Sequence, residues 1–495
     1  MPLRKYAIGK RNILEVFPLI TERFDHNSET FSLIDRIIVI GLMGLIVGAT
    51  LAFGAVEPWS LAMLETLVIT LLVIWGIRSA LLGELKIIIP STALPILALL
   101  ILALAQDLFF SLDAEATRLA AELLLILFIA FLLFSNFLAA PRTLPWLRNF
   151  LIFFGLAMAI FGLIQHFTWN GKFFWVVKLR MQPPSPFGPF VNHNNFAGFL
   201  EMIAPFPMVL ILRRVVRGGL ALLYGFAAAM MGLAIVLSLS RGGMLSFVAS
   251  LMFVVVFGFN TSRSRSAAVS ATQAHSRNRR SRSSFPIPIT ASRIFAIVLM
   301  VFTIGVGAWW IGVDPLVRSV EKSELSLDAT GDHPGKETFY QSRGWIWRDT
   351  AAMIRSHWVT GVGLGAFPTA YPIYSASNGA TVTSQAHNDY LQIMADAGIF
   401  GAIIALWFIF LIARDTVRAL RRGNQMMAAT ALGAASGVFA LMVHSLFDFN
   451  LQIPSNTLLF LALTACVSRI AADARRGDGN VSERNAAPSR TRQAE

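Results

Sequence analysis

Long apolar stretches recur along most of the chain, and they restrict its possible folds more than any other feature of the sequence. The first, residues 37–55, reads IIVIGLMGLIVGATLAFGA and contains no charged residue. A helix of about 19 apolar residues can cross a hydrocarbon core about 30 Å thick. We count about twelve such windows, at residues 37–55, 60–78, 87–105, 119–138, 149–167, 195–213, 219–238, 242–259, 293–312, 396–413, 426–445 and 454–471. The pattern predicts an all-α fold, a polytopic transmembrane helical bundle of about twelve spans.

The composition also indicates a membrane protein. Charged residues make up only 14% of the 495 residues, against about 25% in a typical soluble domain. The 36 residues before the first window carry charges of both signs, so they do not resemble a cleavable signal peptide and are expected to stay on the chain. The single cysteine, Cys466, excludes an intramolecular disulfide and a thiol-bound metal cluster.

The net charge of +13 is distributed as membrane topology requires, and no signature of a nucleic-acid reader is present. Seven arginines and no acid fall between residues 260 and 293, in a Ser-rich low-complexity segment. Cytoplasmic loops carry an excess of Lys and Arg. The expected order is a cytoplasmic segment 1–36, transmembrane helices 1–8 over 37–259, a cytoplasmic Arg/Ser-rich loop 260–292, helix 9 at 293–312, a large and partly helical external loop 313–395, helices 10–12 over 396–471 and a cytoplasmic tail 472–495.

This orientation gathers most of the chemically capable side chains at the outer face. Arg241, in a turn between two windows, lies where the positive-inside bias disfavours an arginine. The loop before it adds Lys172, Lys178 and Arg180, with no acid between residues 169 and 194. Arg241 can extend to the lipid headgroups. Alternatively, these cations bind a membrane-bound anion such as a lipid phosphate or diphosphate.

Two motifs of the external loop can be explained by local structure without any catalytic role. The segment RGWIWRDTAAMIRSHW is predicted to form a helix with Ser342 as its N-cap. Gly361, Gly363 and Gly365 follow with a spacing that resembles a nucleotide-binding loop. Because no strand precedes them, we reject that function.

The segment around His387 also has a simple interpretation. Asp389 and Gln392 have the spacing of a helix capping box, with His387 just outside it. Capping accounts for the acid and the amide, but it does not require the histidine.

Four motifs follow one another between residues 185 and 401: SPFGPFVNHNNFAGFLEMIAPFPM (185–208), SLSRGGM (238–244), SRGWIWRDTAAMIRSHWVTGVGLGAF (342–367) and HNDYLQIMADAGIFG (387–401). Together they resemble the O-antigen ligase family of bacterial polytopic membrane proteins. The resemblance covers about residues 185–415. It rests on the set and its order, because each motif alone is weak.

The resemblance implies a metal-independent, inverting glycosyltransferase that uses no cofactor. The donor would be a glycan on an undecaprenyl diphosphate carrier, and the acceptor a hydroxyl of lipid A–core or of a growing glycan. The enzyme would lie in the bacterial inner membrane with its active site facing the periplasm. The family pattern places catalysis on Arg241, Arg343 and His387. Two guanidiniums can bind a diphosphate, and a histidine can remove a proton near neutral pH.

Several polar residues are open to more than one interpretation. Together with Arg241 and Arg343, the candidates for substrate binding are Lys172, Lys178, Arg180, His193 and Asn194. His193 is either a second acid/base group or a hydrogen-bonded residue at the start of a helix. His444 and Asp448 are either polar loop residues or part of an acceptor site.

Other functions remain open at this stage. An O-antigen or exopolysaccharide polymerase of the same family would share these motifs. Glu65, Glu122 and Glu201 lie inside apolar windows, where carboxylates can relay protons or ions, so they favour a secondary transporter. The chain shows no internal repeat of the kind that transporters have. A structural or assembly protein of the membrane is the third class.

Overall fold

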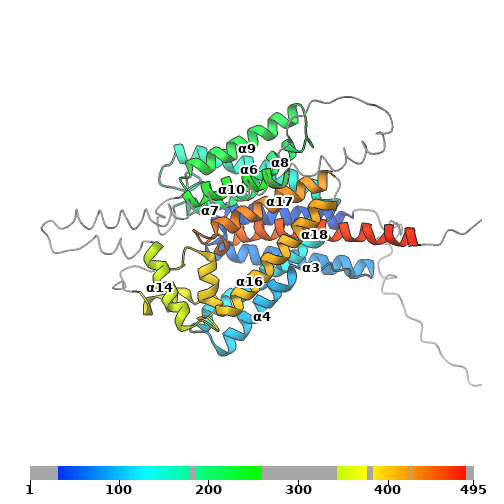
Figure 1. Ribbon diagram of the computed structural model, residues 1–495. Coiled ribbons are helices and arrows are strands. Elements are labelled where there is room, and N and C mark those ends of the chain that lie inside the picture. Colours follow the sequence, from blue (N-terminus) through cyan, green and yellow to red (C-terminus); the bar gives the residue numbers. More distant parts are fainter. Residues whose placement is uncertain (1–31, 179–185, 259–342, 376–382, 423–424, 487–495) are drawn as a thin grey trace, which may run out of the picture.

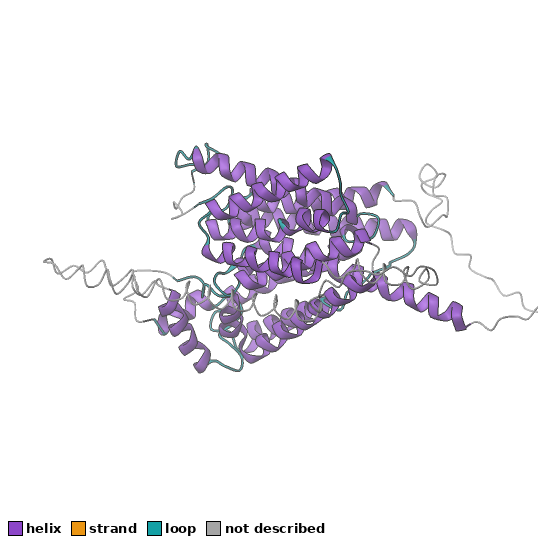
Figure 2. Ribbon diagram, turned by 45° about the horizontal axis from the view of Figure 1, so that its top comes forward, coloured by secondary structure: helices purple, strands orange, loops and turns teal. Residues whose placement is uncertain are grey.

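The computed structural model describes residues 32–178, 186–258, 343–375, 383–422 and 425–486. The protein is an all-α polytopic bundle (Figures 1 and 2). Over the described ranges, ten helical segments are long and apolar enough to cross a membrane. They are α2 (Leu33–Leu51), α3 (Pro58–Leu82), α5 (Ala114–Leu133) with η3 (Phe134–Leu138), α6 (Leu144–Phe167), α7 (His193–Ile203) with α8 (Pro205–Leu212), α9 (Gly219–Leu237), α10 (Arg241–Gly258), α16 (Asp389–Arg422), α17 (Gln425–His444) and α18 (Pro454–Ala486).

The helices agree with the apolar windows wherever the structure describes them. The third window corresponds to a shorter apolar helix, α4 (Ala93–Phe109), which begins six residues later than expected. The window at 293–312 and the Arg/Ser-rich loop lie outside the described residues. Two other helices extend beyond their windows: α16 begins at Asp389, within the expected external loop, and α18 continues to Ala486, within the expected tail.

Several helix ends follow from local chemistry. Ser32 and Asp35 form a reciprocal capping box at the start of α2. Pro58 occupies the first turn of α3, where its missing N–H is not needed, and Gly83 ends that helix with φ of 64°. Asp113 caps α5 by accepting a hydrogen bond from the Ala116 amide.

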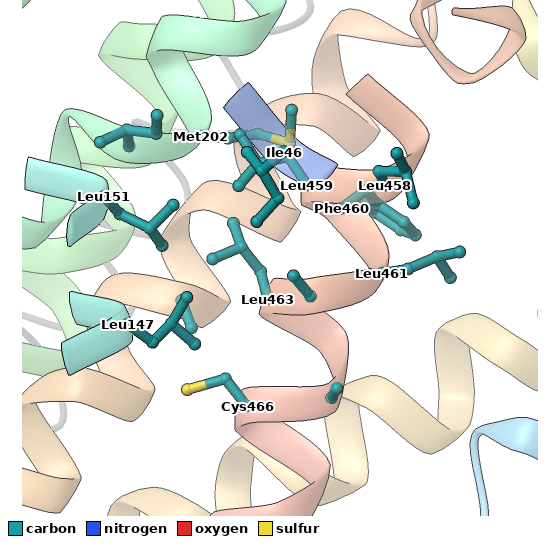
Figure 3. Packing of buried hydrophobic residues seen from close by; sticks show 14 of the residues in the cluster. Ile46, Leu147, Leu151, Met202, Leu458, Leu459, Phe460, Leu461, Leu463 and Cys466 are labelled. Carbon is teal, nitrogen blue, oxygen red and sulfur yellow. The ribbon is translucent and has the colours of Figure 1, made fainter. Parts of the chain in front are cut away.

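Burial distinguishes central helices from peripheral ones. The apolar windows of α7–α8 and α18 are 83% buried inside the bundle, whereas those of α3 and α9 are 28% buried. Figure 3 shows Leu463 and Cys466 of α18 packed near Leu147 and Leu151 of α6. The peripheral helices therefore keep apolar faces available for lipid.

The described part of the external loop is partly helical, as predicted. It contains α14 (Arg343–Ser356), α15 (Phe367–Ala370) and η4 (Tyr371–Ile373). The proposed cap of α14, Ser342, lies outside the described residues. Ile346 and Met353 share a buried face of α14, and α14 lies beside the start of α16 at one end of the bundle (Figure 1).

The glycine-rich segment after α14 packs against a break in α16. Gly398 has a non-helical φ of 59°, and the amide of Ile399 donates to the carbonyl of Trp358 at 2.9 Å. A Cβ on Gly361 would lie 2.3 Å from the carbonyl oxygen of Asp396. These glycines therefore serve close backbone contact, which agrees with rejecting a nucleotide-binding loop.

Candidate functional site

The segment at the start of α16 is held against the turn between α17 and α18. The side chain of Asn388 accepts hydrogen bonds from the amides of Tyr390 and Leu391, both at 3.0 Å, so Asn388 caps α16. Asp389 instead accepts from the Ser445 hydroxyl at 2.7 Å and from the Leu451 amide at 3.2 Å. The predicted capping box of Asp389 and Gln392 was therefore wrong. Asp389 joins two chain segments that are far apart in sequence.

Two of the three predicted catalytic residues meet at one carboxylate. Nδ1 of His387 lies 3.4 Å from Oδ1 of Asp448, and Nη2 of Arg343 lies 3.3 Å from Oδ2 of the same residue. The Asp448 side chain is only 1% exposed, whereas Arg343 is 26% and His387 32% exposed. Asp448 thus lies beneath the two groups that can contact a substrate.

The charge of Asp448 is maintained by its neighbours. Burial alone would raise the pKa of its carboxyl group, but the hydrogen bond with His387 and the positive charge of Arg343 lower that pKa below its ordinary range. Asp448 is therefore ionised at neutral pH. Asp448 is a polar residue of the turn between α17 and α18, and its side chain is buried within the cluster.

The backbone of His387 is in the left-handed region, with φ of 49°. This conformation costs a non-glycine residue about 1–3 kcal/mol and persists only where surrounding contacts impose it. Here the Nε1–H of Trp347 donates to the Ala386 carbonyl at 3.0 Å, and the His387 ring lies edge-on to Phe449 at 4.8 Å. Trp347 of α14 therefore holds the backbone next to His387, and Phe449, from the turn before α18, packs against the imidazole.

Arg241, the third predicted catalytic residue, is the first residue of α10 and is half-buried. Its neighbour Gly242 packs against His444, because a Cβ on that glycine would lie 2.9 Å from Nε2 of the histidine. His444 is the last residue of α17, directly before the turn that carries Asp448. The start of α10 therefore adjoins the turn that carries the His387–Asp448–Arg343 cluster.

Glu201 of α7 and His444, at the end of α17, form a pair next to this turn. Nδ1 of His444 lies 3.0 Å from Oε1 of Glu201, and the Ser246 hydroxyl donates to Oε2 at 2.6 Å. Both partners are fully buried, so His444 is not a polar loop residue. Glu201 is therefore hydrogen-bonded and not isolated within its apolar window. Glu65 and Glu122 lie near each other on α3 and α5.

His193 connects the cluster to a cavity. It lies close enough to Asp448, Arg343 and His444 for their charges to interact. It also lines a cavity of about 300 Å³ together with His166, Phe187 and Ser238. His193 is the first residue of α7, whose cap is Asn192, and the Asn194 amide donates to that cap at 2.9 Å.

A comparison with known protein families finds a match that covers part of this site. Residues 226–406 match the family described as O-antigen ligase. Over these residues the chain is similar to the O-antigen ligase family. The match contains Arg241, Arg343 and His387, whereas Asp448 and His193 lie outside it. No curated protein sequence matches the chain.

The described structure shows no contact between the other predicted substrate-binding residues and the His387–Asp448–Arg343 cluster. Lys172 and Lys178 are exposed in the loop between α6 and α7, and no contact in the described structure joins them to Asp448. Arg180 lies outside the described residues. Among the residues that are described, no three His, Cys, Asp or Glu side chains form a group that could hold a metal ion.

The sequence contained a weak signal for the missed residue. His444 and Asp448 were recognised as a polar pair four residues apart, but the pair did not reveal its partners. Asp448 is separated from His387 by 61 residues and from Arg343 by 105. Only the packing of α14, α16 and α17 brings them together.

Proposed function

We propose that the chain is a membrane glycosyltransferase that moves a glycan from undecaprenyl diphosphate to an acceptor hydroxyl. The observation that carries this proposal is the His387–Asp448–Arg343 cluster, which combines a base, a buried carboxylate and a guanidinium at one end of the bundle. The similarity of residues 226–406 to the O-antigen ligase family supports lipid-linked glycan substrates.

His387 acts as the general base in this mechanism. Asp448 accepts a hydrogen bond from Nδ1–H of His387, and this tautomer leaves Nε2 as the proton acceptor. Nε2 removes the proton of the acceptor hydroxyl, and the oxygen forms a bond to the anomeric carbon of the donor glycan. General-base catalysis of this kind contributes about 10²–10⁴-fold in rate.

Arg343 and Arg241 bind the leaving group. As the bond between the anomeric carbon and the diphosphate breaks, negative charge develops on the diphosphate oxygens. A planar guanidinium can donate two hydrogen bonds to such an anion. The salt bridge to Asp448 fixes Arg343 before the donor binds.

The reaction proceeds as one displacement, so the configuration at the anomeric carbon inverts. The two guanidiniums supply the positive charge, and transfer is expected to continue in the presence of a metal chelator. The donor carrier cannot leave the bilayer, which suits a base held at the end of a transmembrane bundle. We place this end at the periplasmic face of the bacterial inner membrane.

The acceptor distinguishes two versions of the proposal. A ligase transfers the glycan to lipid A–core, and a polymerase transfers it to a growing glycan. The cavity beside His193 is lined by aromatic and polar side chains that could contact either sugar. Reactions supplied with each acceptor in turn would separate the two activities.

The central experiment compares His387→Asn with His357→Asn. Asparagine tolerates positive φ, so it removes the base without imposing a new backbone conformation. His357 lies one residue beyond α14 and serves as the matched control. Glycan transfer by the purified protein should fall about 10²-fold or more in His387→Asn and stay unchanged in His357→Asn. Wild-type turnover by His387→Asn would refute the mechanism.

A further inference from the structure

A second cavity, of about 500 Å³, lies at the opposite end of the bundle from Asp448. It is lined by the side chains of Asp35 on α2, Arg78 on α3, Asn136 on η3 and Arg469 on α18, and by Lys86 and Arg142 from the connecting turns. Arg469 follows Pro454, the first residue of α18, by fifteen residues. At a rise of 1.5 Å per residue this separation is about 22 Å, most of a bilayer core.

The lining of this cavity is strongly basic. Four cationic side chains and one acid, Asp35, line the cavity, and Asp35 forms a salt bridge with Arg78. Outside the lining, the exposed Glu84 pairs with Lys86. Nε of Arg469 contacts Asp473 at 3.3 Å, whereas its Nη1 is buried and has no hydrogen-bond partner among the described residues. A buried guanidinium N–H without an acceptor is costly. The cavity therefore has a net positive charge and an unused donor.

Local hydrogen bonds hold the two backbone segments that carry Lys86 and Arg142. The Asn136 side chain accepts from the Ile88 amide at 2.8 Å and donates to the Ile88 carbonyl at 3.0 Å, which fixes the segment that carries Lys86. The Thr143 hydroxyl donates to the Phe137 and Leu138 carbonyls at 2.5 and 3.0 Å, which fixes the turn that carries Arg142. The positive-inside bias explains basic loops, but it does not require that they converge on a structured cavity.

We propose that this cavity binds the phosphate headgroup of an anionic phospholipid from the leaflet at that end of the bundle. Arg78 is anchored by Asp35 and by the Phe137 ring, whose centroid is 5.6 Å from the guanidinium carbon. Arg469 supplies the unused donor, and Lys86 and Arg142 close around the headgroup from the rim. The acyl chains would extend along the exposed apolar faces of α3, such as Val73 and Ile77. Basic recesses between transmembrane helices suit anionic headgroups.

The test measures lipid binding by the full-length protein in detergent. Phosphatidylglycerol is titrated while native mass spectrometry counts bound lipid, with phosphatidylcholine as the zwitterionic comparison. The double variant Lys86→Glu/Arg142→Glu changes two exposed side chains of the rim. Arg217→Glu, exposed in the turn before α9 at the same end, is the charge-matched control.

Wild type and Arg217→Glu should bind phosphatidylglycerol in preference to phosphatidylcholine. The double variant should bind it at least about tenfold more weakly, because each basic side chain near a headgroup contributes measurably. Equal phosphatidylglycerol binding by all three proteins would overturn the proposal. If the double variant fails to fold, Lys86→Gln/Arg142→Gln removes the same charges with less repulsion.

A second arm distinguishes a lipid from a soluble phosphate compound. Glycerol 3-phosphate is added to the protein in phosphatidylcholine nanodiscs, and thermal stability is measured. A lipid site should show little stabilisation by the soluble compound and clear stabilisation by phosphatidylglycerol in the nanodisc. Full stabilisation by glycerol 3-phosphate alone would overturn the assignment to a lipid.

Discussion

Asp448 is the residue on which the proposed chemistry depends most, although it would not touch the substrate. It accepts from His387 through one oxygen and from Arg343 through the other. A change at Asp448 therefore disturbs the base and the guanidinium together. It is a positioning residue, so its effect should depend on whether the histidine is present.

The first prediction concerns a double-mutant cycle. Asp448→Asn keeps the shape of the side chain and its bond from the Phe449 amide, but it removes the charge that orients His387. Turnover should fall about 10²-fold or more, because a general base needs a fixed orientation and tautomer. The double variant His387→Asn/Asp448→Asn should be no slower than the slower single variant, since residues that act as a unit are not additive. If the rate losses of the two single variants multiply in the double variant, Asp448 acts independently of His387.

The second prediction concerns the guanidinium of Arg343. Lysine keeps the positive charge but loses the planar pair of donors, so Arg343→Lys should lower transfer about 10²-fold while the protein still inserts normally. Arg348→Lys is the matched control, because Arg348 lies on the same helix and is exposed, with its guanidinium over the Trp345 ring at 3.6 Å. Initial rates at saturating donor would measure both. Unimpaired transfer by Arg343→Lys would mean that charge alone suffices.

At this scale the sequence predicted the reactive groups but not the residues that support them. His387, Arg343 and Arg241 could be selected because they are unusual at the edge of a membrane and match a family pattern. Asp448 could not be selected as a shared partner, because its contacts with His387 and Arg343 span 61 and 105 residues. Asn388 caps α16 through local bonds, but the sequence equally allowed the adjacent Asp389 as the cap.

At the scale of elements, the contact between the glycine-rich segment and α16 couples α14 to the membrane bundle. The amide of Val362 donates to the Ala395 carbonyl at 2.9 Å, on the side of the break opposite Ile399. The break at Gly398 exposes backbone groups of α16, and residues 358–363 satisfy them. The helix that carries Arg343 is thus attached to the helix that follows His387.

The third prediction tests this attachment. Gly361→Ala would place a Cβ 2.3 Å from a backbone carbonyl at a residue with φ of 70°, so it should destabilise the protein by more than about 1 kcal/mol and lower activity. Gly76→Ala is the control, because Gly76 lies in α3 with nothing within 4 Å of its Cβ position. Thermal unfolding midpoints in detergent would compare the two. A midpoint for Gly361→Ala equal to that of Gly76→Ala would contradict the tight contact.

The whole molecule has two charged ends joined by an apolar bundle, and the sequence predicted this organisation well. Every described apolar window falls on a helix, because bilayer thickness imposes both length and composition on a span. The exact helix boundaries were less predictable. The break at Gly398 lets α16 begin before its apolar window, and such a break depends on the segment packed against it.

The last prediction concerns orientation. If the Arg343 end faces the periplasm, a cysteine at Ser356, exposed at the end of α14, should react with a membrane-impermeant maleimide in intact spheroplasts. A cysteine at Arg217 should react only after the membrane is permeabilised. The native Cys466 is fully buried among α18 and its neighbours (Figure 3), so it should stay unlabelled and serve as the internal control. If only the cysteine at position 217 reacted in intact spheroplasts, the orientation of the protein would be the reverse of the one proposed. The proposed base would then face the cytoplasm, and transfer to a periplasmic acceptor would be impossible.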